Sequence, residues 1–171
     1  MKTVLQKVRS GLNSKLGFFI LTVILFAIKD GWAYENKFAL GAVGNVQQFL
    51  LWFNAFPGAI ILIGIALYFR GRLSYWLMIL IDAILSTWLF ANILYYREFS
   101  DFITFNLISG SGSVSNNLGK SLAGIFRMSD LFVYTDVVIL ILVLAFKLIR
   151  IDGRYFKLRY AGVITMLGVL L

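Results

Sequence analysis

The densest group of charged and aromatic side chains lies at residues 95–102, where two tyrosines precede an arginine. A guanidinium group binds phosphate through two parallel hydrogen bonds, so this group suits the head group of a phospholipid. Tyr and Arg at a membrane interface are also ordinary anchors, and anchoring remains the alternative. The candidate head-group residues in this segment and its continuation are Arg97, Glu98, Asp101, Lys120 and Arg127.

Asp82 is a second candidate because it lies about ten residues into a long apolar run. A carboxylate in that position costs several kcal/mol unless it is protonated, paired or hydrated. Ser86 is one helical turn further along the same face. The pair predicts either a proton or cation relay or a neutral carboxyl group that hydrogen-bonds a neighbouring helix, and the second interpretation is favoured. The sequence suggests no buried basic partner.

Clustered catalytic or metal-binding residues are not evident. The chain has no His and no Cys, which excludes the commonest metal ligand and all thiolate chemistry. Gly119-Lys120-Ser121 resembles the end of a phosphate-binding loop, but Val114 occupies the position of its first glycine. We therefore predict no catalytic residue, no metal ligand and no cofactor in these 171 residues.

The composition places these candidates in a membrane protein. Hydrophobic residues make up 60% of the chain and charged residues 14%, against about a quarter charged in soluble domains. The net charge of +8 comes from basic residues clustered between apolar runs. That clustering indicates contact with the surface of a lipid bilayer and not with nucleic acid.

The apolar runs predict an all-α membrane protein of five transmembrane helices. A helix needs about 20 apolar residues to cross the hydrocarbon core. The final run is shorter, so we expect it to continue beyond Leu171. The whole of 1–171 is expected to be one transmembrane domain, with spans at about 16–34, 46–69, 73–96, 131–146 and 158–171.

The distribution of Lys and Arg predicts the orientation. Eleven of the sixteen basic residues lie on the side of the N-terminus, counting Lys29 with the opposite side. Positive charge marks the cytoplasmic side, so we expect a cytoplasmic N-terminus and an extracellular C-terminus in the cell membrane. The connection 97–130 is then external, and a helical pattern at 118–126 predicts a short interfacial helix within it.

Several stretches resemble the N-terminal membrane region of lipoteichoic acid synthases of Gram-positive bacteria. They are KVRSGLNSKLGFFILTVILFAIK at the start, LFANILYYREFSDFITFNLI at 89–108, SGSVSNNLGKSLAGIFR at 111–127, and the following Ser129-Asp130. The likeness covers nearly the whole chain. It implies five spans followed by an extracellular sulfatase-like domain, an architecture that agrees with the spans and orientation expected above.

The resemblance also implies a function for the parent protein. Such enzymes are glycerophosphotransferases that polymerise glycerol phosphate from phosphatidylglycerol onto a glycolipid anchor. A threonine nucleophile and a divalent metal, manganese or magnesium, are expected in an outer domain that follows residue 171. The expected partners are the bilayer, phosphatidylglycerol or glycolipid, the chain's own catalytic domain and other cell-envelope membrane proteins.

Two other functions remain open at this point. One is a free-standing lipid or ion transporter that uses Asp82 as its coupling residue. The other is a membrane scaffold for a partner protein, with small-residue helix faces as the interface. The short final apolar run favours a membrane anchor over both.

Overall fold

The computed structural model describes residues 14–38, 44–104, 124–146, 149, 151 and 158–171 of the chain. These residues form α-helices and two 3-10 helices, with no strand among them, which confirms the predicted all-helical fold. The α-helices are α2 (Lys15–Asn36), α3 (Asn45–Gly64), α4 (Arg72–Phe99), α7 (Thr135–Ala145) and α8 (Leu158–Leu170), and the 3-10 helices are η1 (Ile65–Tyr68) and η3 (Met128–Tyr134).

Four of these helical segments are long and apolar enough to cross a membrane: α2, α3 with η1, α4, and η3 with α7. At 13 residues, α8 rises only about 20 Å and is a shorter apolar helix. The five-span count and the orientation remain predictions, and so does the domain description. The interfacial helix expected at 118–126 lies mostly outside the described residues.

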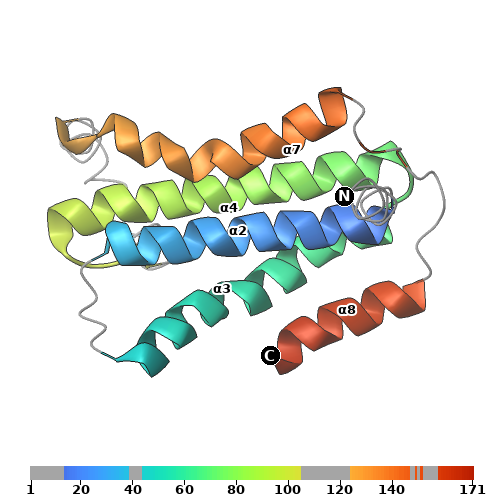
Figure 1. Cartoon of the computed structure of the whole chain (residues 1–171), viewed down its shortest axis with the longest axis horizontal. Helices are drawn as coiled ribbons and strands as arrows, with labels where there is room; N and C mark the ends of the chain where they lie inside the picture. The colour runs from blue at the N-terminus through green and yellow to red at the C-terminus, as the bar shows by residue number, and fades with distance from the viewer. Residues whose placement is uncertain (1–13, 39–43, 105–123, 147–148, 150, 152–157) are drawn as a thin grey trace, which may run out of the picture.

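The helices form a layered bundle in which consecutive helices run in opposite directions (Figure 1). The helices α2, α4 and α7 lie side by side, and α3 crosses α2 obliquely. The last helix, α8, packs against α3 and is covered by no other helix on its far side in this view (Figure 1). Charged groups on α2, α4 and α7 are therefore close in space although they are far apart in the sequence.

Local sequence signals set the helix ends. The hydroxyl of Ser14 accepts a hydrogen bond from the backbone N–H of Gly17 at 2.9 Å, which caps the start of α2. Gly71 has φ +61° and turns the chain between η1 and α4, a conformation that glycine adopts without a steric penalty. The hydroxyl of Ser74 donates to the carbonyl of Ala66 at 2.7 Å and closes that turn.

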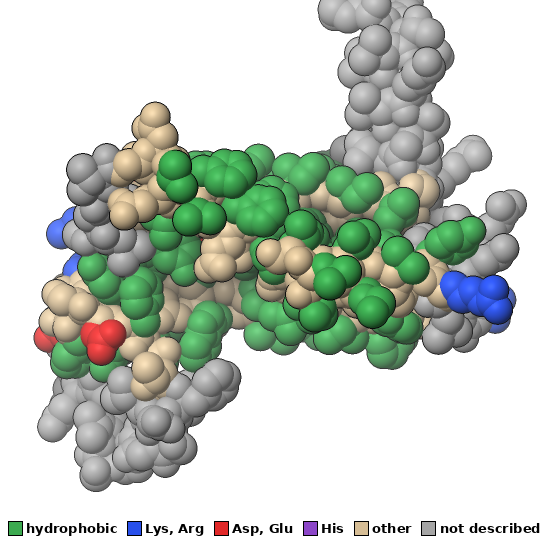
Figure 2. Space-filling view, turned by 90° about the horizontal axis from the view of Figure 1, so that it is seen from below, with side chains coloured by type: hydrophobic (Ala, Val, Ile, Leu, Met, Phe, Trp, Pro, Cys, Tyr) green, Lys and Arg blue, Asp and Glu red, His purple; other side chains and the backbone are tan. Residues whose placement is uncertain are grey.

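The interior is apolar, and so is the outer surface between the two ends. Phe18, Ile63, Tyr75, Met78 and Leu140 are fully buried where α2, α3, α4 and α7 meet. Hydrophobic side chains also cover the middle of the face in Figure 2, with charged side chains at its ends. An exposed stripe of large apolar side chains at helical spacing along α4 shows the same property: Trp76, Leu80, Ile84 and Trp88. Such a surface fits a lipid environment.

Candidate functional site

A buried carboxylate at one end of the bundle joins three helical segments. The side chain of Asp130, in η3, is 0% exposed and accepts two hydrogen bonds from the guanidinium of Arg97, in the last turn of α4, both at 2.8 Å. Lys37, at the end of α2, donates to the same carboxylate at 2.9 Å. The backbone N–H of Arg127 adds a fourth bond at 3.0 Å. We call Lys37, Arg97 and Asp130 the end clamp.

The end clamp fixes the positions of two cations. Arg97 also donates to the carbonyl of Ile125 at 2.6 Å, and Lys37 donates to the hydroxyl of Ser129 at 2.9 Å. A buried carboxylate with four hydrogen bonds is well satisfied, whereas removing one partner of such a pair costs about 3–5 kcal/mol. The clamp therefore orders the ends of α2 and α4 against η3.

The structure brings together only part of the predicted head-group site. Arg97 lies at the end of the bundle with 20% of its side chain exposed, and Glu98 and Asp101, which follow it closely in the sequence, are exposed. The side chain of Arg127 is exposed too, and its backbone N–H donates to the carboxylate that pairs with Arg97. Arg127 forms no salt bridge with the described residues. Lys120 lies outside the described residues. The role of these residues in lipid binding remains a prediction.

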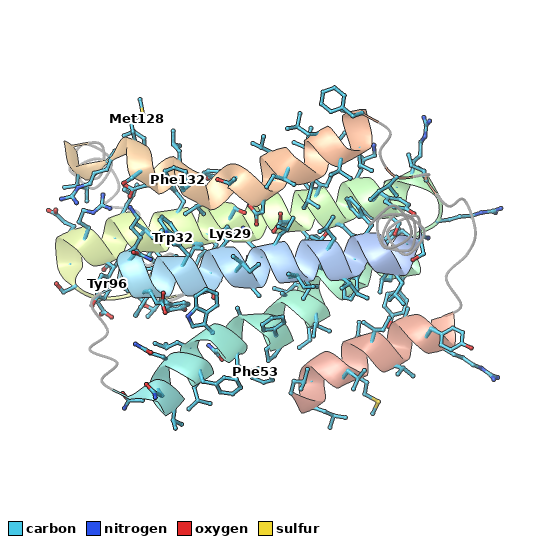
Figure 3. The ribbon with its side chains drawn as sticks, in the orientation of Figure 1. Lys29, Trp32, Phe53, Tyr96, Met128 and Phe132 are labelled. Carbon is cyan, nitrogen blue, oxygen red and sulfur yellow. The ribbon has the colours of Figure 1, made fainter. Side chains whose placement is uncertain are left out.

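Inside the bundle, one ammonium group joins two carboxyl groups from different helices. Lys29 of α2 forms salt bridges with Asp136 of α7 and, at 3.5 Å, with Asp82 of α4. It also donates to the hydroxyl of Ser86 at 2.6 Å, and this hydroxyl donates to the carbonyl of Asp82. The side chains of Lys29, Asp82 and Asp136 are 5%, 0% and 3% exposed. We call these three residues the buried triad (Lys29 is labelled in Figure 3).

The buried triad corrects two interpretations of the sequence. The sequence pattern counts Lys29 among the outer charges and suggests no basic partner for Asp82, but the Lys29 side chain lies inside the bundle and pairs with Asp82. Asp136, near the start of the fourth apolar run, is also buried against Lys29. The pairing of Asp82 and Ser86 on one helix face is confirmed, since both contact Lys29.

A signal for the buried triad is present in the sequence. Lys29 lies inside an apolar run, and Asp82 and Asp136 lie inside two others. Ionisable residues within a span are rare and commonly pair with one another. Three such residues of complementary charge in three spans could therefore have indicated the cluster. The end clamp had a weaker signal, because Lys37 and Asp130 resemble ordinary charges at the ends of apolar runs.

The described residues contain no group of three or more His, Cys, Asp or Glu side chains that could hold a metal ion. The two clusters instead combine carboxylates with Lys or Arg. Both clusters suit ion pairing, and only the end clamp, with two cations on one carboxylate, has an excess of positive charge that suits an anionic group.

Comparison with known proteins identifies the family. Residues 1–171 match the Lipoteichoic acid synthase N-terminal domain. The chain is 40% identical over 157 residues to Lipoteichoic acid synthase 1 of Bacillus subtilis, which covers 92% of this chain and 24% of that protein. It is 32% identical over 154 residues to Lipoteichoic acid synthase of Staphylococcus saprophyticus, covering 90% of this chain and 24% of that protein.

A third relative is Lipoteichoic acid synthase of Staphylococcus aureus strain USA300, 30% identical over 158 residues, with 92% of this chain and 24% of that protein covered. The comparison with solved structures found no match. The relatives are enzymes, and this chain spans about a quarter of their length, corresponding to their N-terminal part. The chain belongs to the lipoteichoic acid synthase N-terminal domain family and is a membrane domain of that kind.

Proposed function

We propose that this chain anchors and orients an outer catalytic domain that polymerises glycerol phosphate from phosphatidylglycerol onto a glycolipid. In this proposal the end of the bundle at Arg97 faces the outside of the cell and binds the phosphate of a substrate lipid. The relatives' names support a part in lipoteichoic acid synthesis, and the basic residues near the N-terminus support the orientation. The threonine nucleophile and the divalent metal belong to the outer domain.

The observation that carries the proposal is the fixed position of Arg97 at the end of the bundle. Asp130 holds the guanidinium through two hydrogen bonds, while 20% of the side chain stays exposed. Arg127 lies close to Asp130 in the sequence, and its side chain is exposed. It adds another cation, and unlike Arg97 it forms no salt bridge with the described residues. A phosphate group needs such donors, and prior ordering of Arg97 lowers the entropy lost on binding.

Phosphatidylglycerol binding to the purified chain tests this role. Arg97→Ala should weaken binding by at least tenfold, since charge-assisted hydrogen bonds contribute about 1.5–3 kcal/mol each. Arg72→Ala, at the opposite end of α4, is the matched control and should bind as the wild type does. Asp130→Asn removes the prior ordering of Arg97 but keeps the guanidinium, so it should bind less tightly than the wild type and more tightly than Arg97→Ala.

If Asp130→Asn lost lipid as completely as Arg97→Ala, Arg97 would serve only the clamp, and the lipid-binding part of the proposal would be wrong.

The transporter alternative can be tested with the same material. Ion or lipid flux in proteoliposomes that Asp82→Asn abolishes would favour transport, and unchanged passive flux would favour the anchor. The scaffold alternative predicts a stable protein partner that copurifies from the native membrane.

A further inference from the structure

A cavity of about 300 Å³ lies between α2 and α4, near the ends where the chain leaves both helices. Phe26, Asp30 and Tyr34 line it from α2 at a spacing of one helical turn. Trp88 and Asn92 line it from α4, and Phe102 closes it from the segment after α4. The volume is at the lower limit of small-molecule sites, which matches a compact head group.

Asp30 is the charged residue of the cavity and accepts no hydrogen bond from the described residues. It takes part in none of the salt bridges among them. Lys29, the preceding residue in the chain, already forms salt bridges with the two carboxyl groups of the buried triad. The carboxylate of Asp30 therefore forms no salt bridge within the described part of the chain, and the charge closest to it in the sequence is already paired.

The other polar side chain from α4 is already satisfied. The amide of Asn92 donates to the carbonyl of Trp88 at 2.9 Å and accepts from the backbone N–H of Ile103 at 3.0 Å. A ligand in the cavity would thus meet one negative charge surrounded by aromatic rings. Five of the ten lining residues are aromatic: Phe26, Tyr34, Phe38, Trp88 and Phe102.

This combination selects among cations. A hard metal ion such as Ca²⁺ needs six to eight oxygen ligands, which usually come from several carboxylates and carbonyls together. The cavity has a single carboxylate, that of Asp30. An organic ammonium group needs fewer oxygens and gains attraction from aromatic faces, especially that of Trp. We propose that the cavity binds an organic ammonium group, with Asp30 as its counter-ion and the rings of Tyr34 and Trp88 against its methyl or methylene groups.

Two sources present this chemistry, the ammonium head group of a membrane lipid and a soluble ammonium compound. The proposal does not depend on the lipid-phosphate role of Arg97, which lies outside this cavity. Failure of one therefore leaves the other intact.

The test is titration of the purified chain in phosphatidylglycerol nanodiscs with tetramethylammonium chloride, against sodium chloride at equal concentration, followed by ligand-observed NMR. Asp30→Asn should weaken tetramethylammonium binding at least tenfold. Glu35→Gln, on the same helix, is the matched control, because an amide oxygen can still accept the hydrogen bond from Trp52. Tyr34→Phe should bind normally, and Tyr34→Leu should bind several-fold more weakly because it lacks a ring.

Competition then separates the sources. Displacement of tetramethylammonium by phosphatidylethanolamine in the nanodisc, and not by free ethanolamine, identifies a lipid; the reverse identifies a soluble compound. Both results support an ammonium site. Equal binding by Asp30→Asn and wild type, equal effects of sodium and tetramethylammonium, or equal displacement by a neutral glycosyl diacylglycerol would each overturn the proposal.

Discussion

Arg97 of α4 and Asp130 of η3, thirty-three residues apart in the chain, form a bidentate salt bridge with both N–O distances at 2.8 Å. Asp130 is fully buried, whereas part of the Arg97 side chain is exposed. The carboxylate thus holds a cation at the end of the bundle without enclosing it. Lys37 shares the same carboxylate, so two helices depend on one acidic side chain.

Asp130→Asn should destabilise the fold, because the substitution leaves two cations without their counter-ion. Breaking a buried ion pair by removing one partner costs about 3–5 kcal/mol. Thermal unfolding in a single detergent, followed by circular dichroism, measures the effect. Asp101→Asn is the control, since Asp101 is exposed and its bond from the backbone N–H of Phe102 can persist. Equal unfolding midpoints for the two variants would show that the end clamp adds no stability.

The buried triad predicts a non-additive pair of substitutions. Either Asp82→Asn or Asp136→Asn alone leaves Lys29 one carboxylate, so each should cost only about 1–2 kcal/mol. The double variant leaves a buried ammonium group with no counter-ion and should cost about 3–5 kcal/mol beyond that. Unfolding midpoints of the singles, the double and the triple variant with Lys29→Met measure the coupling.

The triple variant provides the control, because it removes the cation as well and should recover much of the loss. A double variant whose cost equals the sum of the two singles would mean that one carboxylate does not substitute for the other.

Two glycines on neighbouring helices should respond to alanine in opposite ways. A Cβ atom at Gly31 of α2 would overlap the ring of Trp52 of α3, and a hydrogen bond to Glu35 holds that ring in place. Gly31→Ala should therefore lower stability by about 1–3 kcal/mol. Gly58 of α3 has open space around it, so Gly58→Ala should be neutral or stabilising by up to about 1 kcal/mol. Similar losses for both variants would contradict the close contact of α2 with α3.

The orientation predicts opposite accessibility of two engineered cysteines in a chain that has none. Arg72→Cys should be protected from a membrane-impermeant maleimide in intact cells, and Ser113→Cys should react. Permeabilised cells provide the control, in which both should react. Labelling of the first and protection of the second in intact cells would reverse the proposed topology.

The sequence was sufficient for the helical class and the family, because both depend on long apolar runs and continuous similarity. It was not sufficient for the polar interior. The position of Lys29 in the chain does not tell where its ammonium group lies, because a long lysine side chain can reach along its helix to a partner on another helix. The contact of Lys29 with Asp82 and Asp136 depends on which faces of α2, α4 and α7 meet, and three-dimensional packing decides this. Arg97 was identified from its residue type, whereas its pairing with Asp130 required the structure.

Polymer output of the full-length parent protein tests the central claim that Arg97 acts on the lipid substrate of an outer catalytic domain. Four variants should be compared at equal membrane abundance: Arg97→Lys, Arg97→Ala, Asp130→Asn and Arg72→Lys as the control.

Lysine cannot present two parallel donors to phosphate, so Arg97→Lys should give roughly tenfold less glycerol phosphate polymer, and Arg97→Ala less still. Arg72→Lys should match the wild type, and Asp130→Asn, which keeps the guanidinium, should exceed Arg97→Lys. Wild-type output from Arg97→Lys, or output from Asp130→Asn as low as that of Arg97→Ala, would contradict the claim and leave Arg97 as a structural residue of the end clamp.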